Sequence, residues 1–523
     1  MSTINHVETF EKVSVNSLSP PAPRFSSVSL QENAMGSQTT VKMTNDYSVY
    51  ISAISNAAIQ YNLSVIGIAL YLMDSGKAPA AEGYVPPAYP RTSTQDSLLK
   101  STVFIGAILG QSCMGYAGDA LGRGRALILT NLFTFVGCLA SALLTTGDVD
   151  TVYTIIIVSR LLVGIGIGGK YPLSATIRAE GVEQANAAEE VGDANETEDT
   201  SAASAADQPT RHRATEVAKG FFWQTPGVIF PYALAWALVA ICGEEKIGQA
   251  YQSTVSFQFR FLFGFGAVPA FMVIVLTYLQ YIAPQRNAPG LNEEDAVVVE
   301  NPFKVVRENP HLRKVLIGTC CSWFFYDFVY YGTAVAQPDI LRRVFGNGDG
   351  VFNNCWQNIL LTAMGLPGVI LAILQMERLG AKRLMTWGFI MIFVTCLTLS
   401  MTLLFLPHSI VVNFSITCCL ILILNWGCNV ATYVLPTEAF PAEIRSSFYG
   451  LSAAGGKTGA FFGAYLFGPL SKAFGYSFVY GVCVCGALIG LYVSHSYIKP
   501  YGQGSFCKAA ELRQTDDRQR LLR

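Results

Sequence analysis

The sequence predicts an all-α membrane protein in which twelve transmembrane helices form two halves of six helices each. Hydrophobic residues make up 51% of the 523 residues and charged residues only 14%, whereas a soluble domain carries about 25% charged residues. The apolar residues also cluster, as in 384–406, into stretches longer than the roughly 20 residues that cross the hydrocarbon core. Backbone groups in lipid must pair within their own segment, so we expect these stretches to be helices.

Twelve such stretches can be placed along the chain. The first six spans are expected at 48–73, 97–117, 126–146, 152–175, 217–242 and 258–283. The second six are expected at 315–336, 353–375, 384–406, 410–435, 447–470 and 475–497. The polar stretch 285–313, which we expect to be a cytoplasmic loop, separates the N-terminal half (47–284) from the C-terminal half (314–498).

Two tails and one insert complete the predicted organisation. Residues 1–46 are rich in Ser, Pro, Asn and Gln, a composition typical of a disordered tail. An acidic insert rich in small residues, at about 180–210, is expected to be a solvated cytoplasmic loop. Most Lys and Arg residues of the short loops fall on one side if the N-terminus is inside, so both termini, including the tail 499–523, should be cytoplasmic.

The composition excludes several functional classes. The net charge is −1 and no basic patch is present, so a nucleic-acid partner is not expected. The 13 cysteines lie mostly in apolar stretches, as small hydrophobic residues do, and no metal or cofactor site is predicted. GIGIGG before Lys170 is similar to a phosphate-binding loop, but Tyr171 replaces its Ser or Thr, and close helix packing explains these glycines better. We therefore expect no enzyme activity and no catalytic residues.

Two pairs of segments repeat between the halves. GYAGDALGRGR (115–125) and QMERLGAKR (375–383) each hold an acid, a glycine three residues later, and then basic residues. The ends of spans 4 and 10 also agree, as PLSATIRAE (172–180) and PTEAFPAEIR (436–445). Related halves place a substrate site between them, near the middle of the membrane.

The acids and arginines of these segments are candidates for a latch between the halves. An acid at a helix end can cap the helix and pair with a nearby Arg, and such a contact can form in one conformation and break in another. A basic inner loop with a glycine turn would also explain the pattern. The candidate latch residues are Asp119, Arg123, Arg125, Glu180, Glu377, Arg378, Glu438 and Arg445.

The loop 115–125, of the form GxxxDxxGRxR, resembles the signature loop of the major facilitator superfamily. GIGIGGKYPLSATIRAE (164–180) is similar to the span 4 signature of the phosphate:proton symporters of fungi and plants. WFFYDFVYY (323–331), 366–380 and 425–460 resemble further segments of that family. The resemblance implies the major facilitator fold and secondary active transport of inorganic phosphate by alternating access, coupled to protons. It does not extend to the N-terminal tail, the segment 74–96 or the acidic insert.

The resemblance assigns substrate contacts to polar residues inside the spans. They are Tyr171, Gln224, Trp323, Asp327, Tyr331 and Asn429, and Lys457 also matches the family pattern and would attract an anion. Neutral donors lower the desolvation cost of an anion without trapping it. Simpler explanations exist: Trp and Tyr form interfacial belts, and Asn429 could join neighbouring helices.

Asp327 is the strongest single candidate. Its spacing from Trp323 and Tyr331 puts all three side chains on one helix face. A carboxylate inside a span is costly and indicates function by default, here as the proton carrier. Asp327 could instead be a structural partner of Lys170 or Lys457.

The chain departs from the family where the symporters carry acids in spans 1 and 4. Ile59, Asn62 and Lys170 occupy those positions. Ile59 and Asn62 cannot load and release a proton as a buried carboxylate does. Lys170 could titrate if it is buried, or more simply add a fixed positive charge near the anion. Two mechanisms remain: Asp327 alone carries the proton, or Lys170 serves as a counter-charge in an exchanger or facilitator of organic phosphate or another anion.

A phosphate receptor that transports nothing is the alternative from another class, because it would not need the missing acids. Its long signalling tail is not evident, since only about 24 residues follow Lys499. The family expectation for location is the plasma membrane. The ending DRQRLL (517–522) is similar to a sorting signal that would favour a vacuolar or endosomal membrane.

Overall fold

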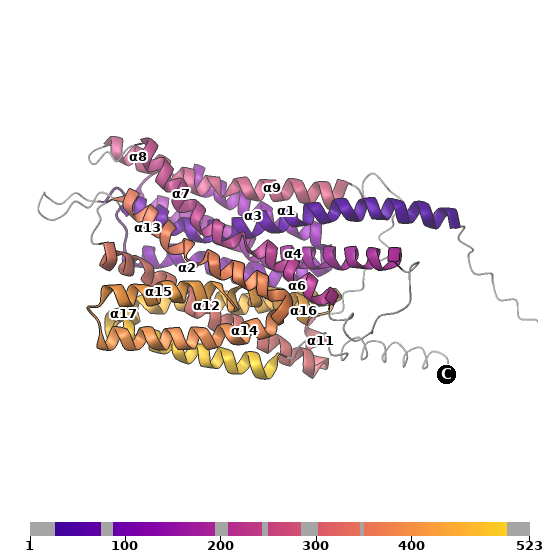
Figure 1. Ribbon diagram of the computed structural model, residues 1–523. Coiled ribbons are helices and arrows are strands. Elements are labelled where there is room, and N and C mark those ends of the chain that lie inside the picture. The colour runs from indigo at the N-terminus through magenta and orange to yellow at the C-terminus, as the bar shows by residue number, and fades with distance from the viewer. Residues whose placement is uncertain are drawn as a thin grey trace, which may run out of the picture.

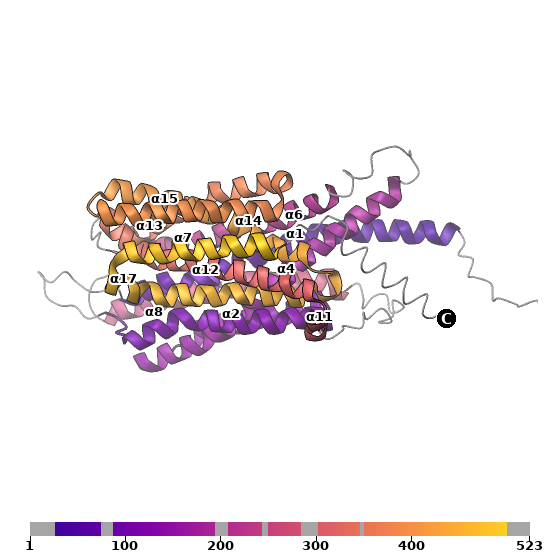
Figure 2. The same cartoon turned by 90° about the horizontal axis from the view of Figure 1, so that it is seen from below.

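The computed structural model describes residues 27–74, 87–193, 208–242, 249–283, 302–345 and 350–498. Every regular element in these ranges is helical. Figures 1 and 2 show the long helices running side by side in one elongated bundle, with α1 and α4 extending beyond it at the end where α6 and α11 lie.

The helices follow the two predicted halves. The N-terminal half contains α1 (Ser27–Asp74), α2 (Ser93–Leu121), α3 (Arg123–Leu143), α4 (Val149–Asp193), α6 (Gln208–Phe221), α7 (Gln224–Cys242), α8 (Gln249–Phe265) and α9 (Ala267–Thr277), which a π-helical turn (Tyr278–Ile282) continues. The C-terminal half contains α11 (Pro302–Glu308), α12 (Pro310–Phe345), α13 (Val351–Ala363), α14 (Leu366–Phe405), α15 (Ile410–Asn425), α16 (Cys428–Ala439) and α17 (Arg445–Tyr497), with a 3-10 turn (Ala442–Ile444) before α17.

These helices accommodate the twelve predicted spans. Nine segments of the described residues are long and apolar enough to cross a membrane. Two of them, Val351–Phe405 and Arg445–Tyr497, each contain two predicted spans. The predicted span 315–336 lies within α12, which is not among the nine.

Three glycines separate consecutive spans without a longer loop. Gly122, Gly380 and Gly475 have φ of 87°, 74° and 82° and ψ of 149°, 158° and 166°. This left-handed φ favours glycine because it lacks a Cβ. Gly122 and Gly380 are the glycines of the two repeated loops, so the repeat in the sequence corresponds to the same backbone break in each half.

Other glycines allow helices to pack backbone against backbone. A Cβ on Gly164 or Gly168 of α4 would collide with the backbone of α2 at Val103 or Ala107. A Cβ on Gly459 of α17 would meet the Phe324 carbonyl of α12. Small residues at four-residue spacing favour such contacts in membranes, so the packing interpretation of GIGIGG is confirmed.

Two predicted loop regions are partly helical. α1 begins at Ser27, so the prediction of a disordered tail is wrong for 27–46, and 1–26 lie outside the described residues. α4 continues to Asp193 and α6 begins at Gln208, so the predicted loop at 180–210 is wrong at both ends. A long apolar span supplies the costly helix nucleus, and polar residues without proline then extend the helix.

Candidate functional site

A small polar cavity lies between the two halves. Its wall comes from α1, α4, α6 and α7 on one side and from α12, α16 and α17 on the other. The lining residues are Gln60, Tyr171, Phe221, Gln224, Trp323, Asp327, Tyr330, Tyr331, Asn429, Thr432 and Lys457. All six residues that the family resemblance assigned to substrate, and Lys457, therefore meet in one place.

Lys457 and Asp327 form a buried ion pair in the C-terminal wall of the cavity. Lys457 Nζ lies 2.9 Å from Asp327 Oδ2 and donates to the Tyr331 hydroxyl at 3.1 Å. The same ammonium lies 5.1 Å from the ring centroid of Tyr171, within cation–π range. Both members of the pair are almost fully buried, with side chains 3% and 4% exposed. Lys457, rather than Lys170, is thus the partner of Asp327.

A chain of amide groups forms the N-terminal wall. Gln60 Nε2 donates to Gln224 Oε1 at 2.7 Å, and Gln224 Nε2 donates to Asn56 Oδ1 at 2.9 Å. Asn56 Nδ2 in turn donates to the Tyr433 hydroxyl of the other half at 3.1 Å. Sequence reasoning missed Asn56, Gln60 and Tyr433. The spacing of Asn56 and Gln60, four residues apart in an apolar span, was the available signal.

Two helix breaks place site residues at the cavity. The break between α6 and α7 makes Gln224 the first residue of α7. The break at Gly427, with φ 77°, puts Asn429 in the first turn of α16. The first backbone N–H groups of a helix have no partner within the helix and favour anions. Asn429 Nδ2 donates to Asn425 Oδ1 at 3.1 Å, just before this break.

The aromatic residues of the cavity are not an interfacial belt. Trp323 and Tyr171 are each 3% exposed. Their rings pack edge to face across the interface between the halves, with the ring centroids 6.1 Å apart. Belt residues lie at the lipid headgroups, so burial between the halves contradicts that explanation for this pair.

Lys170 lies elsewhere. Its side chain is fully buried, and its Nζ has no hydrogen-bond partner among the described residues. It is not among the residues that line the polar cavity. Lys170 interacts electrostatically with the Cys138 thiol of α3, and that thiol donates to Asn62 Oδ1 at 3.1 Å. The predicted contact of Lys170 with substrate is therefore not part of this cavity's geometry.

Arg160 is a second buried cation on α4. One guanidinium nitrogen donates to the Asn62 carbonyl, while Nε and Nη1 have no hydrogen-bond partner among the described residues. The guanidinium lies 5.2 Å from the Phe263 ring centroid. Arg160 and Lys170 thus have no ion pair in the part of the chain that the structure describes, whereas Arg178, also on α4, pairs with Glu216.

A junction of charged groups joins the halves at one end of the bundle. Asp119 of α2 accepts from the backbone N–H of Ser446 at 3.3 Å and of Ser447 at 2.7 Å, and also from the Ser447 hydroxyl. Arg123 pairs with Asp119 and donates to the Ala442 carbonyl at 2.9 Å. The predicted latch contact at Asp119 and Arg123 therefore joins α2 and α3 to the C-terminal half.

Glu180, Glu183 and Arg445 extend this junction. Glu180 lies 3.0 Å from Arg123 and 4.0 Å from Arg445. Arg445 makes two hydrogen bonds to Glu183, at 3.1 and 3.0 Å, and Arg213 of α6 also pairs with Glu183. Glu183 and Arg213 were not predicted: Glu183 lies in the insert that was expected to be a solvated loop, and Arg213 follows that insert in α6.

The other latch candidates lie on nearby elements. Arg125 is in the first turn of α3, Glu377 and Arg378 precede Gly380 in α14, and Glu438 is at the end of α16. Their part in a latch stays a prediction.

Two family profiles match most of the chain. The one described as "Sugar (and other) transporter" matches residues 48–185, and the one described as "Major Facilitator Superfamily" matches residues 227–464. The chain belongs to the major facilitator superfamily. The resemblance inferred from the loop 115–125 is confirmed, as is the prediction of a transporter rather than an enzyme.

Curated relatives are phosphate transporters. Inorganic phosphate transporter PT2 of Toxoplasma gondii is 32% identical over 425 residues, 80% of this chain and 66% of that protein, so this chain spans about two thirds of it. Probable inorganic phosphate transporter 1-6 of Arabidopsis thaliana is 25% identical over 510 residues, 87% of this chain and 92% of the relative. The repressible high-affinity phosphate permease of Neurospora crassa is 24% identical over 446 residues, 74% and 72% of the two chains. The similarity predicted from spans 4, 7 and 10 is confirmed.

Solved structures confirm the fold. The proton:xylose symporter XylE bound to 6-bromo-6-deoxy-D-glucose matches with a TM-score of 0.64 at 17% identity, over 88% of this chain and 96% of that chain. The inward-open form of XylE matches with a TM-score of 0.57 at 17% identity, over 87% and 97%. The predicted major facilitator fold is therefore correct.

Proposed function

We propose that this multi-pass membrane protein carries inorganic phosphate across a membrane by alternating access, using the polar cavity as its substrate site. The convergence of seven predicted residues on one buried cavity supports the proposal most strongly. The curated relatives reported above, which are named phosphate transporters or permeases, support the choice of anion.

The chemistry of the cavity suits phosphate. Gln224, Asn429, Trp323 and Tyr171 offer neutral hydrogen-bond donors, and Lys457 offers a positive charge. The start of α16 adds backbone donors beside Asn429. An arriving phosphate competes with Asp327 for Lys457, so binding exchanges one ion pair of Lys457 for another and leaves the Asp327 carboxylate without its partner.

The charged junction provides the conformational latch. Asp119, Arg123, Glu180 and Arg445 hold α2, α4 and α17 together at one end of the bundle. For the cavity to open at that end these contacts must break, and they re-form when it closes. With the orientation predicted from Lys and Arg, this end faces the cytoplasm.

Asp327 is the proposed proton carrier. Its carboxylate is held beside Lys457, and phosphate binding to that ammonium frees the carboxylate to take up a proton. Phosphate binding and proton uptake would then be coupled within a single cavity. The division of the chain into tails, halves and central loop, and the plasma membrane as location, also stay proposals; the DRQRLL ending lies outside the described residues.

Reconstituted vesicles test the coupling. Uptake of labelled phosphate should rise when the vesicle interior is made more alkaline than the outside. Asp327→Asn should abolish this uptake. The matched control is Asp96→Asn, in the first turn of α2 at the surface, which should leave uptake unchanged. Uptake that ignores the pH gradient in the native protein would contradict proton symport.

An exchanger or facilitator of organic phosphate or another anion is the second candidate. The unpartnered Lys170 and the absence of acids at Ile59 and Asn62 favour it, because a fixed positive charge assists an anion without binding a proton. Gradient-independent uptake with strong stimulation by internal phosphate would support exchange. Phosphate binding without any flux would instead support a receptor.

A further inference from the structure

Tyr433 of α16 lies between the polar cavity and the charged junction. Along α16 it comes after Asn429 and Thr432, which line the cavity. The 3-10 turn that carries Ala442 of the junction follows the end of this helix. The Tyr433 side chain is fully buried and is not among the residues that line the cavity. A passage from the cavity to this end of the bundle must therefore pass the level of Tyr433.

The Tyr433 hydroxyl bonds to the opposite half. Asn56 Nδ2 of α1 donates to it at 3.1 Å, and the Ser174 hydroxyl of α4 lies 3.4 Å from it. In α4, Ser174 comes between Tyr171 of the cavity wall and Glu180 of the junction. One oxygen of a C-terminal helix is thus held by two N-terminal helices at a level between the cavity and the junction.

A chain of hydrogen bonds with one direction links the cavity wall to this oxygen. Gln224, which lines the cavity, donates to Asn56 Oδ1 at 2.9 Å, and Asn56 donates to Tyr433. Ser174 uses its only proton for the Lys170 carbonyl at 2.6 Å, so Tyr433 is the donor in its contact with Ser174. Hydrogen bonds in such a chain polarise and strengthen one another. A change at Gln224 therefore alters how firmly Tyr433 is held.

Aromatic rings from both halves pack around Tyr433. Its ring centroid lies 4.7 Å from that of Phe221, 5.9 Å from that of Tyr449 and 6.2 Å from that of Tyr171. Phe221 and Tyr171 also line the polar cavity. The Tyr449 hydroxyl donates to the Tyr433 carbonyl at 2.9 Å. These rings fill the space beside the cavity on the side of the junction, so the cavity is closed in that direction.

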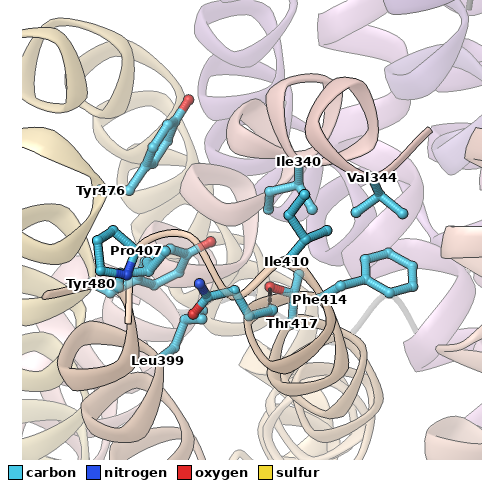
Figure 3. Close-up of a pocket in the computed structure, with 11 residues that line it drawn as sticks. Ile340, Val344, Leu399, Pro407, Ile410, Phe414, Thr417, Tyr476 and Tyr480 are labelled. Carbon is cyan, nitrogen blue, oxygen red and sulfur yellow. Dashed lines mark hydrogen bonds between the residues drawn. The ribbon is translucent and has the colours of Figure 1, made fainter. Parts of the chain in front are cut away.

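Other buried tyrosines keep their hydroxyls within one half. Tyr61 donates to the Leu262 carbonyl at 2.7 Å, and Tyr326 donates to the Leu424 carbonyl at 3.0 Å. Tyr480 lies in the wall of an apolar cavity whose lining residues all belong to the C-terminal half (Figure 3). Separation of the halves would leave these surroundings intact, whereas it must break the contact between Asn56 and Tyr433.

We propose that Tyr433 is a positioning residue that closes the polar cavity toward the charged junction, and that phosphate binding releases it through Gln224 and Asn56. The release rests on the proposed function. Phosphate oxygens accept hydrogen bonds, so they compete with Asn56 Oδ1 for the Gln224 amide. Asn56 then holds the Tyr433 hydroxyl less firmly, and the halves separate more readily at this end. The chain thus transmits the state of the cavity to the contact that closes it.

Hydrogen exchange of the purified full-length protein in lipid nanodiscs, without phosphate, tests the closure. The measured segment is 433–439 of α16, where exchange reports the population of the open form. Tyr433→Phe removes one oxygen and keeps the ring, so exchange should be about fivefold faster, the usual effect of one neutral hydrogen bond. Asn56→Leu should accelerate exchange less in Tyr433→Phe than in the native protein, because both changes remove the same bond. Tyr61→Phe, which removes a buried hydrogen bond within one half, is the matched control and should leave this segment unchanged.

Inorganic phosphate at saturating concentration tests the release. In the native protein it should accelerate exchange of the same segment about fivefold, because the bond to Tyr433 is weakened. In Asn56→Leu it should have little effect on exchange, although calorimetry should still detect phosphate binding, since Asn56 is not among the residues that line the cavity.

Two results would overturn the closing role: exchange that Tyr433→Phe leaves unchanged, or an equal acceleration in Tyr61→Phe. Phosphate that binds the native protein without accelerating exchange, or that accelerates it equally in Asn56→Leu, would overturn the release. Absence of phosphate binding to the native protein would contradict the proposed function and the release with it, while the comparison without phosphate still decides whether Tyr433 closes the cavity.

Discussion

The buried lysines of the two halves have different surroundings. Lys457 in the C-terminal half is paired with Asp327 at 2.9 Å and lines the polar cavity. Lys170 in the N-terminal half is fully buried, has no hydrogen-bond partner among the described residues, and lies outside the cavity wall. A paired charge can be exchanged between partners, whereas an unpaired buried charge is costly until something neutralises it. We therefore propose that the C-terminal half binds the anion reversibly and that Lys170 of the N-terminal half acts as a counter-charge.

Removing the paired lysine should have the largest effect. Lys457→Met takes away the cation of the cavity and leaves Asp327 buried and unpaired, which typically costs about 3–5 kcal/mol. The loss of stability should appear as a lower unfolding temperature. The cation is also the proposed contact for phosphate, and losing a charge-assisted contact worth about 3 kcal/mol should reduce uptake to about 1% of the native rate. Lys472→Met, at an exposed lysine, is the control. Uptake by Lys457→Met at the native rate would contradict the proposal that the polar cavity is the substrate site.

Removing the unpaired lysine should have a mixed effect. Lys170→Met eliminates an uncompensated buried charge, whose desolvation typically costs several kcal/mol, so the free energy of unfolding should rise. The KM for phosphate should increase about tenfold as the counter-charge is lost, equivalent to about 1.4 kcal/mol. Thermal unfolding and uptake kinetics measure the two effects, and Lys170→Arg should change KM less. A stabilised variant with unchanged KM would show that Lys170 does not assist the anion.

The latch should affect conversion between conformations more than binding. Asp119→Asn weakens charge-assisted hydrogen bonds to Ser447 and Arg123, and such bonds are worth about 1.5–3 kcal/mol. We expect uptake to fall about tenfold while phosphate affinity, measured by calorimetry, changes less than about twofold. Glu183→Gln should do less, because Arg445 keeps Glu180 nearby. Equal losses of affinity and uptake would place Asp119 in substrate binding instead.

The amide chain should give the smallest effect. Gln60→Leu removes the hydrogen bond to Gln224 Oε1, so Gln224 is oriented less firmly toward the cavity. We expect the KM for phosphate to rise about fivefold with little change in maximal rate, as for one neutral hydrogen bond. Gln252→Leu, at an exposed position in α8, is the control. A change confined to maximal rate would assign Gln60 to the conformational cycle.

The sequence was informative wherever a residue's role depends on its own helix. Apolar stretches located the spans, and the type and spacing of Trp323, Asp327 and Tyr331 identified one wall of the cavity. Contacts between distant segments were harder to predict, since Asn56 with Tyr433 and Arg445 with Glu183 depend on how the halves dock. Lys170 shows the same limit: its position beside Tyr171 in the chain suggested the cavity, yet adjacent helical residues point about 100° apart.

Phosphate counterflow is the most direct test of transport through the polar cavity. Vesicles containing the purified protein and unlabelled phosphate are diluted into a trace of labelled phosphate, with no pH gradient. The account predicts that label accumulates transiently inside native vesicles and does not accumulate with Lys457→Met. Binding of phosphate without accumulation of label in native vesicles would contradict it.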